Sequence, residues 1–242
     1  LLHGLGATGP LNWMNAFDAL AERYHVVAVD HRGHGHGIST RSFRLKDCAD
    51  DVVAVADVLG VRQFIAVGYS MGGPIAQLTW RRHPANVIGL VLCATAPYFA
   101  GRREKRLGMM GLTGLAAVAR VTPEQTKTWL VEQLYLQRRT EKWEPWAMRE
   151  TADHDWRAIL EAGKAIGKFS STDWLGEVDV PSSSVLTMRD QVVPLRRQVR
   201  LFEQIPDADA FRVDGMHDAV VANADRFAPT LIRAIDSVLR RA

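Results

Sequence analysis

Short apolar runs alternate with amphipathic stretches along the first 93 residues of the chain. The apolar runs are rich in β-branched residues, and each has the length of one buried strand. They lie at 26–30, 62–67 and 87–93. In the intervening stretches, apolar side chains recur three and four positions apart, which predicts amphipathic helices. These helices are predicted at 11–23, 47–59 and 74–82. The alternation predicts an α/β fold with a mostly parallel sheet flanked by helices.

The same alternation returns near the C-terminus after a long interval. Strands are predicted at 182–188 and 208–213, and a final amphipathic helix at 225–240. Between 94 and 178 the strand pattern disappears, and this interval is too long for an ordinary connection within one sheet. It favours a helical cap or lid inserted between two strands. We therefore predict a core made of residues 1–96 and 178–242, and a cap at 97–177.

The predicted cap is rich in aromatic residues and also contains a basic run. It holds five of the seven tryptophans, which are Trp129, Trp143, Trp146, Trp156 and Trp174. Most of them are expected to form the cap's own small core, with a minority lining an apolar pocket. The basic run at 102–106 cannot be buried without partners. It is therefore expected on the outer face of the lid.

One serine lies where the chain passes from a predicted strand to a predicted helix, within Gly68-Tyr69-Ser70-Met71-Gly72. Glycines two before and two after it leave room for a sharp turn that holds the hydroxyl clear of the sheet. The pattern also fits a serine that caps a helix between loop glycines. The preceding strand and the following helix instead favour a nucleophile elbow, which makes Ser70 the candidate nucleophile.

Composition and charge narrow the class of protein. The 242 residues, of which 47% are hydrophobic and 24% charged, are enough for one substantial core. The net charge of +3 is small, and the basic residues lack the glycine and aromatic spacing of RNA-binding motifs. We therefore expect no nucleic-acid partner. No apolar run approaches 18 residues, so no transmembrane segment is expected.

Cysteines and histidines give no sign of a metal or cofactor site. Cys48 and Cys93 lie too far apart for a C-x-x-C motif, and they agree with a reducing, cytoplasmic location. His31, His34 and His36 alternate with glycine in a predicted loop, where no rigid element would fix a tetrahedral set of ligands. We expect no bound metal and no cofactor.

Four motifs occur in an order that resembles the α/β-hydrolase family over essentially the whole chain. They are His-Gly-Leu-Gly at 3–6, Asp-His-Arg-Gly-His-Gly at 30–35, the serine turn, and the late pair Asp190 and His217. The resemblance implies that 3–6 forms the family's oxyanion loop. It also implies eight core strands, of which the first two would precede residue 1. Without them, 26–30 would be an exposed apolar sheet edge. We therefore expect the natural chain to begin before Leu1.

The resemblance and the chain order of serine, acid and histidine assign a role to each late residue. His217, in a loop after the last predicted strand, is the candidate general base. Asp190, directly after a strand, is the candidate acid that orients it. Asp214 and Asp218 flank the histidine in sequence and are expected to be loop or cap residues. His154 lies within no such motif.

A tetrahedral intermediate at Ser70 also requires two preorganised hydrogen-bond donors for its oxyanion. By the same resemblance, these donors are the backbone N–H groups of Leu5 and Met71. The implied reaction is hydrolysis of an acyl bond through an acyl-serine, most simply of a carboxylic ester with an apolar acyl or alcohol part. The expected partner is therefore a small-molecule ester.

Several alternatives share the same motifs. An enol-lactonase and a hydrolase of carbon–carbon bonds in dienoic ketones would use the same oxyanion loop, serine and late pair. The similar haloalkane dehalogenases and epoxide hydrolases use aspartate in place of the serine. A binding protein without catalysis is the alternative of another class, but such members of the family usually lack one residue of the triad.

Overall fold

A four-stranded parallel sheet forms the centre of the protein. The computed structural model describes residues 1–100, 146, 150 and 154–242. The strands stand side by side in chain order, with register pairs such as Tyr69 with Cys93. They are β1 (Phe64–Tyr69), β2 (Val87–Cys93), β3 (Ser182–Thr187) and β4 (Ala208–Val213). Because the strands are parallel, their carboxyl ends meet at one edge of the sheet. The predicted α/β fold is confirmed.

Beyond β1, the sheet continues through short extended segments. Leu2 bridges to Gly68 on one side and to Val29 on the other. The Val29 N–H donates to the Leu1 carbonyl at 3.2 Å. The strand predicted at 26–30 is therefore not a regular strand, because its one ladder contact among the described residues is this isolated bridge at Val29.

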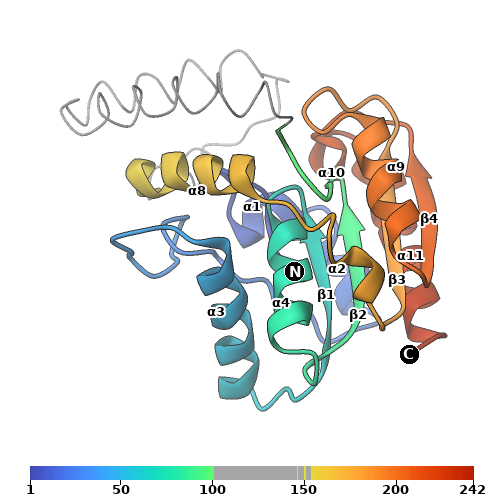
Figure 1. Cartoon of the computed structure of the whole chain (residues 1–242), viewed down its shortest axis with the longest axis horizontal. Coiled ribbons are helices and arrows are strands. Elements are labelled where there is room, and N and C mark those ends of the chain that lie inside the picture. The colour runs from blue at the N-terminus through green and yellow to red at the C-terminus, as the bar shows by residue number, and fades with distance from the viewer. Residues whose placement is uncertain (101–145, 147–149, 151–153) are drawn as a thin grey trace.

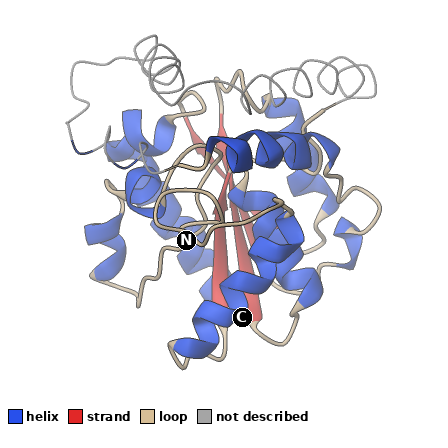
Figure 2. Ribbon diagram, turned by 90° about the vertical axis from the view of Figure 1, so that its left-hand side faces the viewer, coloured by secondary structure: helices blue, strands red, loops and turns tan. Residues whose placement is uncertain are grey.

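Helices cover both faces of the sheet, as Figures 1 and 2 show. One face packs against α3 (Leu45–Val58), α4 (Gly72–Arg82), the 3-10 helix η1 (Leu175–Glu177) and α9 (Leu195–Gln204). The other packs against α1 (Gly9–Trp13), α2 (Phe17–Ala21), α10 (Ala219–Ala222) and α11 (Ala224–Leu239).

The sequence of β2 shows why both faces are covered. Leu90 and Leu92 join the core on the α3 and α4 side, whereas Val91 and Cys93 join the core on the α11 side. A strand that is buried on both faces reads as a continuous apolar run, which is the pattern of a covered parallel sheet. Cys48 and Cys93 are free thiols in different cores.

The helix predicted at 11–23 is two short helices. Thr8 caps α1, because its hydroxyl oxygen accepts a hydrogen bond from the Leu11 N–H at 3.1 Å. A tight turn follows, in which the Ala16 N–H donates to the Trp13 carbonyl at 2.8 Å, and α2 then begins at Phe17. The apolar spacing therefore indicates the buried Leu11, Trp13 and Leu20, but Met14 is exposed, and the spacing does not indicate the break between the two helices.

Helix α8 (Trp156–Lys168) is a described part of the predicted cap. It lies above α3 and α4, at the end of the molecule toward which the β2 arrow points (Figure 1). The Asp155 side chain caps its first turn, and its buried residues include Ala158 and Ala162. Trp129, Trp143 and the basic run at 102–106 lie outside the described residues. Among the helices that the structure describes, none has the length and apolarity that crossing a membrane requires.

Candidate active site

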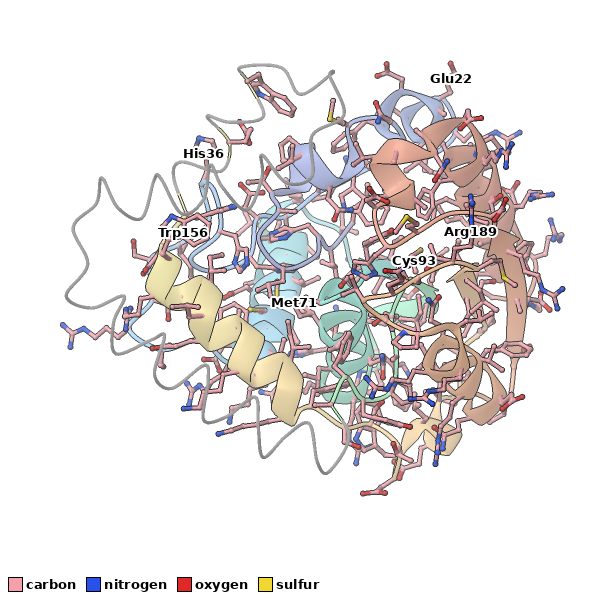
Figure 3. The ribbon with its side chains drawn as sticks, turned by 90° about the horizontal axis from the view of Figure 1, so that it is seen from above. Glu22, His36, Met71, Cys93, Trp156 and Arg189 are labelled. Atoms are coloured by element: carbon pink, nitrogen blue, oxygen red, sulfur yellow. The ribbon has the colours of Figure 1, made fainter. Side chains whose placement is uncertain are left out.

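Ser70 occupies the turn between β1 and α4 and has a left-handed backbone conformation, with φ of 51°. Such a conformation is strained for a residue with a side chain. A Cβ atom on Gly68 would lie 2.2 Å from the Gly72 carbonyl oxygen, and one on Gly72 would lie 2.2 Å from the Leu2 carbonyl oxygen. Both flanking glycines are therefore sterically required, as the sequence indicated. Met71, the next residue, precedes the first turn of α4 and lies near the centre of the molecule when it is seen from above (Figure 3).

The structure brings Ser70, His217 and Asp190 together from three separate loops. His217 Nε2 lies 2.9 Å from Ser70 Oγ, and His217 Nδ1 lies 2.7 Å from Asp190 Oδ2. Because an ionised carboxylate only accepts hydrogen bonds, Nδ1 carries the proton. Nε2 of the neutral ring is then the acceptor for the serine hydroxyl, as a general base requires.

Further donors hold the Asp190 carboxylate in place. Its Oδ1 accepts hydrogen bonds from the N–H groups of Val192 at 2.9 Å and Val193 at 2.8 Å. Its Oδ2 accepts one from the Thr187 hydroxyl at 2.7 Å. Burial raises the pKa of this carboxyl, but the hydrogen bond and charge of His217, with the other donors, hold the pKa below its ordinary value. Asp190 is therefore ionised at neutral pH.

The two aspartates closest to His217 in sequence are directed elsewhere. Asp214 forms a surface ion pair with Arg189 at 2.8 Å. Asp218 is exposed and precedes α10. Neither forms a hydrogen bond with the imidazole in the described part of the chain, in line with the expectation that they are loop residues.

Residues 4–7 form a tight turn beside Ser70, which we call the oxyanion turn. The Ala7 N–H donates to the Gly4 carbonyl at 3.3 Å, and Gly6 has φ of +69°, as a type II turn requires. A Cβ atom on Gly4 would lie 3.4 Å from Ser70 Cβ, so the turn lies against the serine. The Gly4 N–H donates to Asn12 Oδ1 at 3.1 Å, and Asn12 is buried. Sequence reasoning did not identify Asn12.

The N–H groups of Leu5 and Met71 are the predicted oxyanion donors. Within the part of the chain that the structure describes, neither donates to a protein acceptor. Met71 is fully buried, whereas Leu5 is 42% exposed. A Cβ atom on Gly163 of α8 would lie 3.7 Å from the Leu5 side chain, so α8 closes over this turn.

A cluster of four buried histidines lies behind the oxyanion turn. His3 contacts His31 and His34, with ring centroids 4.2 and 5.0 Å apart, and His34 lies 5.6 Å from His154. Burial lowers the pKa of His3 and of His34 to about 3, so both rings are neutral at pH 7. Within the described ranges, no group of three or more His, Cys, Asp or Glu side chains could hold a metal ion.

His154, which lies within the predicted cap, joins it to two core loops. The Gly35 N–H donates to its Nδ1 at 2.9 Å, so Nε2 carries the proton that it shares with the Gly6 carbonyl at 3.2 Å. Next to it, the Asp155 N–H donates to the Gly33 carbonyl at 3.0 Å. Sequence reasoning missed His154, since no local motif marks it.

Asp30, at the start of the 30–35 motif, connects neighbouring loops. Its Oδ1 accepts from the Gly9 N–H at 2.6 Å, and its Oδ2 accepts from the His36 N–H at 3.0 Å. Arg32 forms two hydrogen bonds of 2.6 Å with Asp51 of α3. This motif therefore stabilises the loops beside the oxyanion turn.

Comparison with known families gives the chain its class. Residues 1–223 match the family described as the alpha/beta hydrolase fold. The chain belongs to this family. As an alpha/beta hydrolase, it is 27% identical over 241 residues to the candidate carbamate hydrolase RutD of Rhizobium rhizogenes. That match covers 96% of this chain and 90% of the relative.

Solved structures show the same alpha/beta hydrolase fold. The esterase EaEST of Exiguobacterium antarcticum matches with a TM-score of 0.81 and 21% identity, over 98% of this chain and 90% of that chain. The enol-lactonase of Burkholderia xenovorans LB400 matches with a TM-score of 0.78 and 21% identity, over 97% and 89% of the two chains. The protein is thus a hydrolase of the alpha/beta fold.

Proposed function

We propose that this alpha/beta hydrolase is a serine esterase with Ser70, His217 and Asp190 as its catalytic triad. The continuous hydrogen-bond path from Ser70 Oγ through both nitrogens of His217 to Asp190 carries this proposal. A hydroxyl is a weak nucleophile until a base removes its proton, and this path supplies that base. The substrate is a carboxylic ester with an apolar acyl or alcohol part.

Acylation begins when Ser70 Oγ attacks the ester carbonyl carbon while His217 Nε2 takes the hydroxyl proton. The buried Asp190 carboxylate stabilises the imidazolium and keeps the ring oriented. The N–H groups of Leu5 and Met71 donate to the oxyanion of the tetrahedral intermediate. One such donor contributes about 2.7–4 kcal/mol in a comparable site.

Collapse of this intermediate breaks the bond to the alcohol, and His217 returns the proton to the departing oxygen. An acyl-serine remains at Ser70. Water then attacks the acyl carbon, His217 again takes the proton, and the second intermediate releases the acid and the free serine. Each proton therefore moves through His217 Nε2.

The preference for an apolar substrate part follows from the cover above the site. Leu5 presents an aliphatic side chain between the oxyanion turn and Gly163 of α8. We infer that the predicted lid at 97–177 completes this cover with apolar side chains facing Ser70. Each methylene of the acyl chain buried there contributes up to about 0.8 kcal/mol, or nearly fourfold in affinity.

Carbamate hydrolysis is the second candidate, supported by the end-to-end similarity to RutD. A carbamate carbonyl would be attacked by the same serine and stabilised by the same donors. Hydrolysis of an enol-lactone, supported by the likeness to the Burkholderia enzyme, is a third form of the same acyl chemistry. Cleavage of a carbon–carbon bond in a dienoic ketone, or ligand binding without catalysis, would be the remaining alternatives.

A labelling experiment tests the nucleophile. A fluorophosphonate is expected to modify Ser70, and Ser70→Ala should abolish both the label and esterase activity. Ser183→Ala is the matched control, because Ser183 is buried within β3 and its hydroxyl has no hydrogen-bond partner among the described residues. A label on any other serine would contradict the assignment.

A substrate series tests the reaction class. The kcat/KM for p-nitrophenyl esters should rise from acetate to medium chain lengths and fall once the pocket is full. A p-nitrophenyl carbamate and an enol-lactone are measured beside them. A kcat/KM that is flat across the series or highest for acetate would contradict the apolar cover. A higher kcat/KM for the carbamate or the lactone would show that this compound class, and not the ester, is the substrate.

A further inference from the structure

The peptide group between Gly4 and Leu5 carries one of the two proposed oxyanion donors. None of the peptide bonds in the described residues is cis. In a planar trans peptide, the C=O and N–H bonds point in opposite directions. Whatever holds the Gly4 carbonyl therefore also sets the direction of the Leu5 N–H.

Two groups hold that carbonyl, the Ala7 N–H at 3.3 Å and, at a shorter distance, the His3 side chain. Its Nδ1 lies 2.7 Å from the Gly4 carbonyl oxygen, and because the oxygen can only accept, Nδ1 carries the proton. On the other side of the ring, Nε2 accepts a hydrogen bond from the His31 N–H at 3.0 Å. The two bonds together select one neutral tautomer.

The surroundings of His3 keep the ring in this position. Its side chain is completely buried, and the rings of His31 and His34 pack against it. Burial also holds the pKa of His3 at about 3, so the ring remains neutral in ordinary buffers. The triad makes no use of this histidine.

We propose that His3 is a positioning residue, which uses its Nδ1–H to fix the Gly4–Leu5 peptide so that the Leu5 N–H is presented to the oxyanion. This role rests on the proposed serine esterase function. The hydrogen bond to the Gly4 carbonyl also polarises the peptide, which strengthens its N–H as a donor. His3 thus acts through Leu5 and does not touch the substrate.

Two substitutions distinguish the contributions of the two ring nitrogens of His3. His3→Asn places an amide group where Nδ1 lies and can still donate to Gly4. His3→Gln places its amide group where Nε2 lies, which retains the contact with His31 but loses the one with Gly4. We expect His3→Asn to keep kcat within a few-fold of wild type, and His3→Gln to lower kcat about tenfold to hundredfold with KM little changed.

A purely structural role would instead make kcat follow the stability of each variant. Both variants lose one buried hydrogen bond, so both should show lower melting temperatures. If kcat instead follows melting temperature, or if the two variants have equal kcat, the positioning role is overturned.

A double variant checks that the effect passes through Leu5. Leu5→Pro deletes the N–H at a turn position that accepts proline. In that background, His3→Gln should cause no further loss of kcat, because the donor that it misdirects is already absent. An additional tenfold loss would mean that His3 acts elsewhere.

The tautomer can be read in the wild-type protein, independently of how the variants fold. With ¹⁵N-labelled histidine, Nδ1 of His3 should appear as the protonated nitrogen, and its proton should shift when a boronic acid forms a tetrahedral adduct at Ser70. An unprotonated Nδ1 would overturn the proposal. A wild type that neither hydrolyses esters nor labels at Ser70 overturns the esterase function and this role together. An active, labelled wild type with equal variants overturns the role of His3 alone.

Discussion

The Tyr69 hydroxyl donates a hydrogen bond to the backbone carbonyl oxygen of His217, with 2.6 Å between the two oxygens. Tyr69 immediately precedes Ser70 at the end of β1, and its ring is buried. It packs edge-on against Phe227 of α11 at 5.6 Å and against Trp13 at 6.0 Å. The neighbour of the proposed nucleophile therefore fixes the loop that carries the proposed base.

Tyr69→Phe should lower kcat about tenfold with little effect on KM. The substitution keeps the ring packing and removes only the hydroxyl, so the His217 loop loses one anchor. The unfolding free energy should fall by about 1–3 kcal/mol, because a partly buried carbonyl loses its partner. Tyr24→Phe is the control, since that hydroxyl bonds to Asp236 of α11 instead. Ester kinetics and urea unfolding of both variants provide the comparison, and wild-type kcat in Tyr69→Phe would argue against the anchor.

Asp190→Asn should lower kcat by about 10⁴, as the same change does in a well-studied triad. The amide is nearly isosteric but favours the wrong imidazole tautomer, so its NH₂ group would face His217 Nδ1. Asp214→Asn is the matched control. Asp214 is close to His217 in sequence, but its side chain is exposed and pairs with Arg189. Equal loss of kcat in the two variants would place the acid elsewhere.

Leu5→Pro should lower kcat by about 10²–10³, the loss seen when one oxyanion donor is removed. Proline is favoured at the second position of a type II turn, so the turn closed by Ala7 and Gly4 should persist. Leu5→Ala keeps the N–H and controls for the lost side chain. Should the two variants match in kcat and in affinity for a boronic acid, the Leu5 N–H is not a donor to the oxyanion.

Stability should fall steeply as the pH drops below about 6.5. Burial lowers the pKa of His3 and His34 to about 3 and that of His31 well below its ordinary value. Between about 6.5 and 3, the unfolded chain therefore binds protons that the native protein excludes. Each histidine should contribute up to about 1.4 kcal/mol of lost stability per pH unit. The lowered pKa of Asp190 acts in the same direction below about pH 4.

Denaturant unfolding at half-unit steps from pH 7 to pH 4 measures this dependence. His34→Gln should make the slope shallower by about one proton, since one of the excluded sites is gone. A stability that does not change with pH over this range would show that the three rings are protonated in the native protein or accessible to water.

The turn at Ser70 follows from the sequence because its steric requirements are local. Any side chain at position 68 or 72 would clash with a backbone carbonyl oxygen, so both positions require glycine. Five residues are therefore enough to identify the turn. The approach of Asp190 and His217 to the serine follows from a wider rule. Parallel strands end at one edge of a sheet, so residues that follow β1, β3 and β4 meet there.

Other parts of the site depend on packing that local patterns do not encode. Asn12 and His154 contact the oxyanion turn from elements that are distant in sequence or unmarked by a motif. Similarly, apolar spacing identified Trp13 and Leu20 as buried but placed the exposed Met14 on the same face, and it could not show that one helix ends at Trp13 and another begins at Phe17. Such contacts appear only when the elements are assembled.

The hydrogen bonds of His154 have a consequence for how new specificities could arise in this protein. The three proposed triad residues all lie outside 94–181, so a graft of that interval from a relative would leave them in place. A crossover before residue 154 also retains the link to Gly6 and Gly35. A crossover after α8 replaces His154. The oxyanion turn of the chimera would then lack the hydrogen bond between His154 Nε2 and the Gly6 carbonyl. We therefore expect grafts that rejoin the native sequence before position 154 to change substrate range with the least loss of turnover.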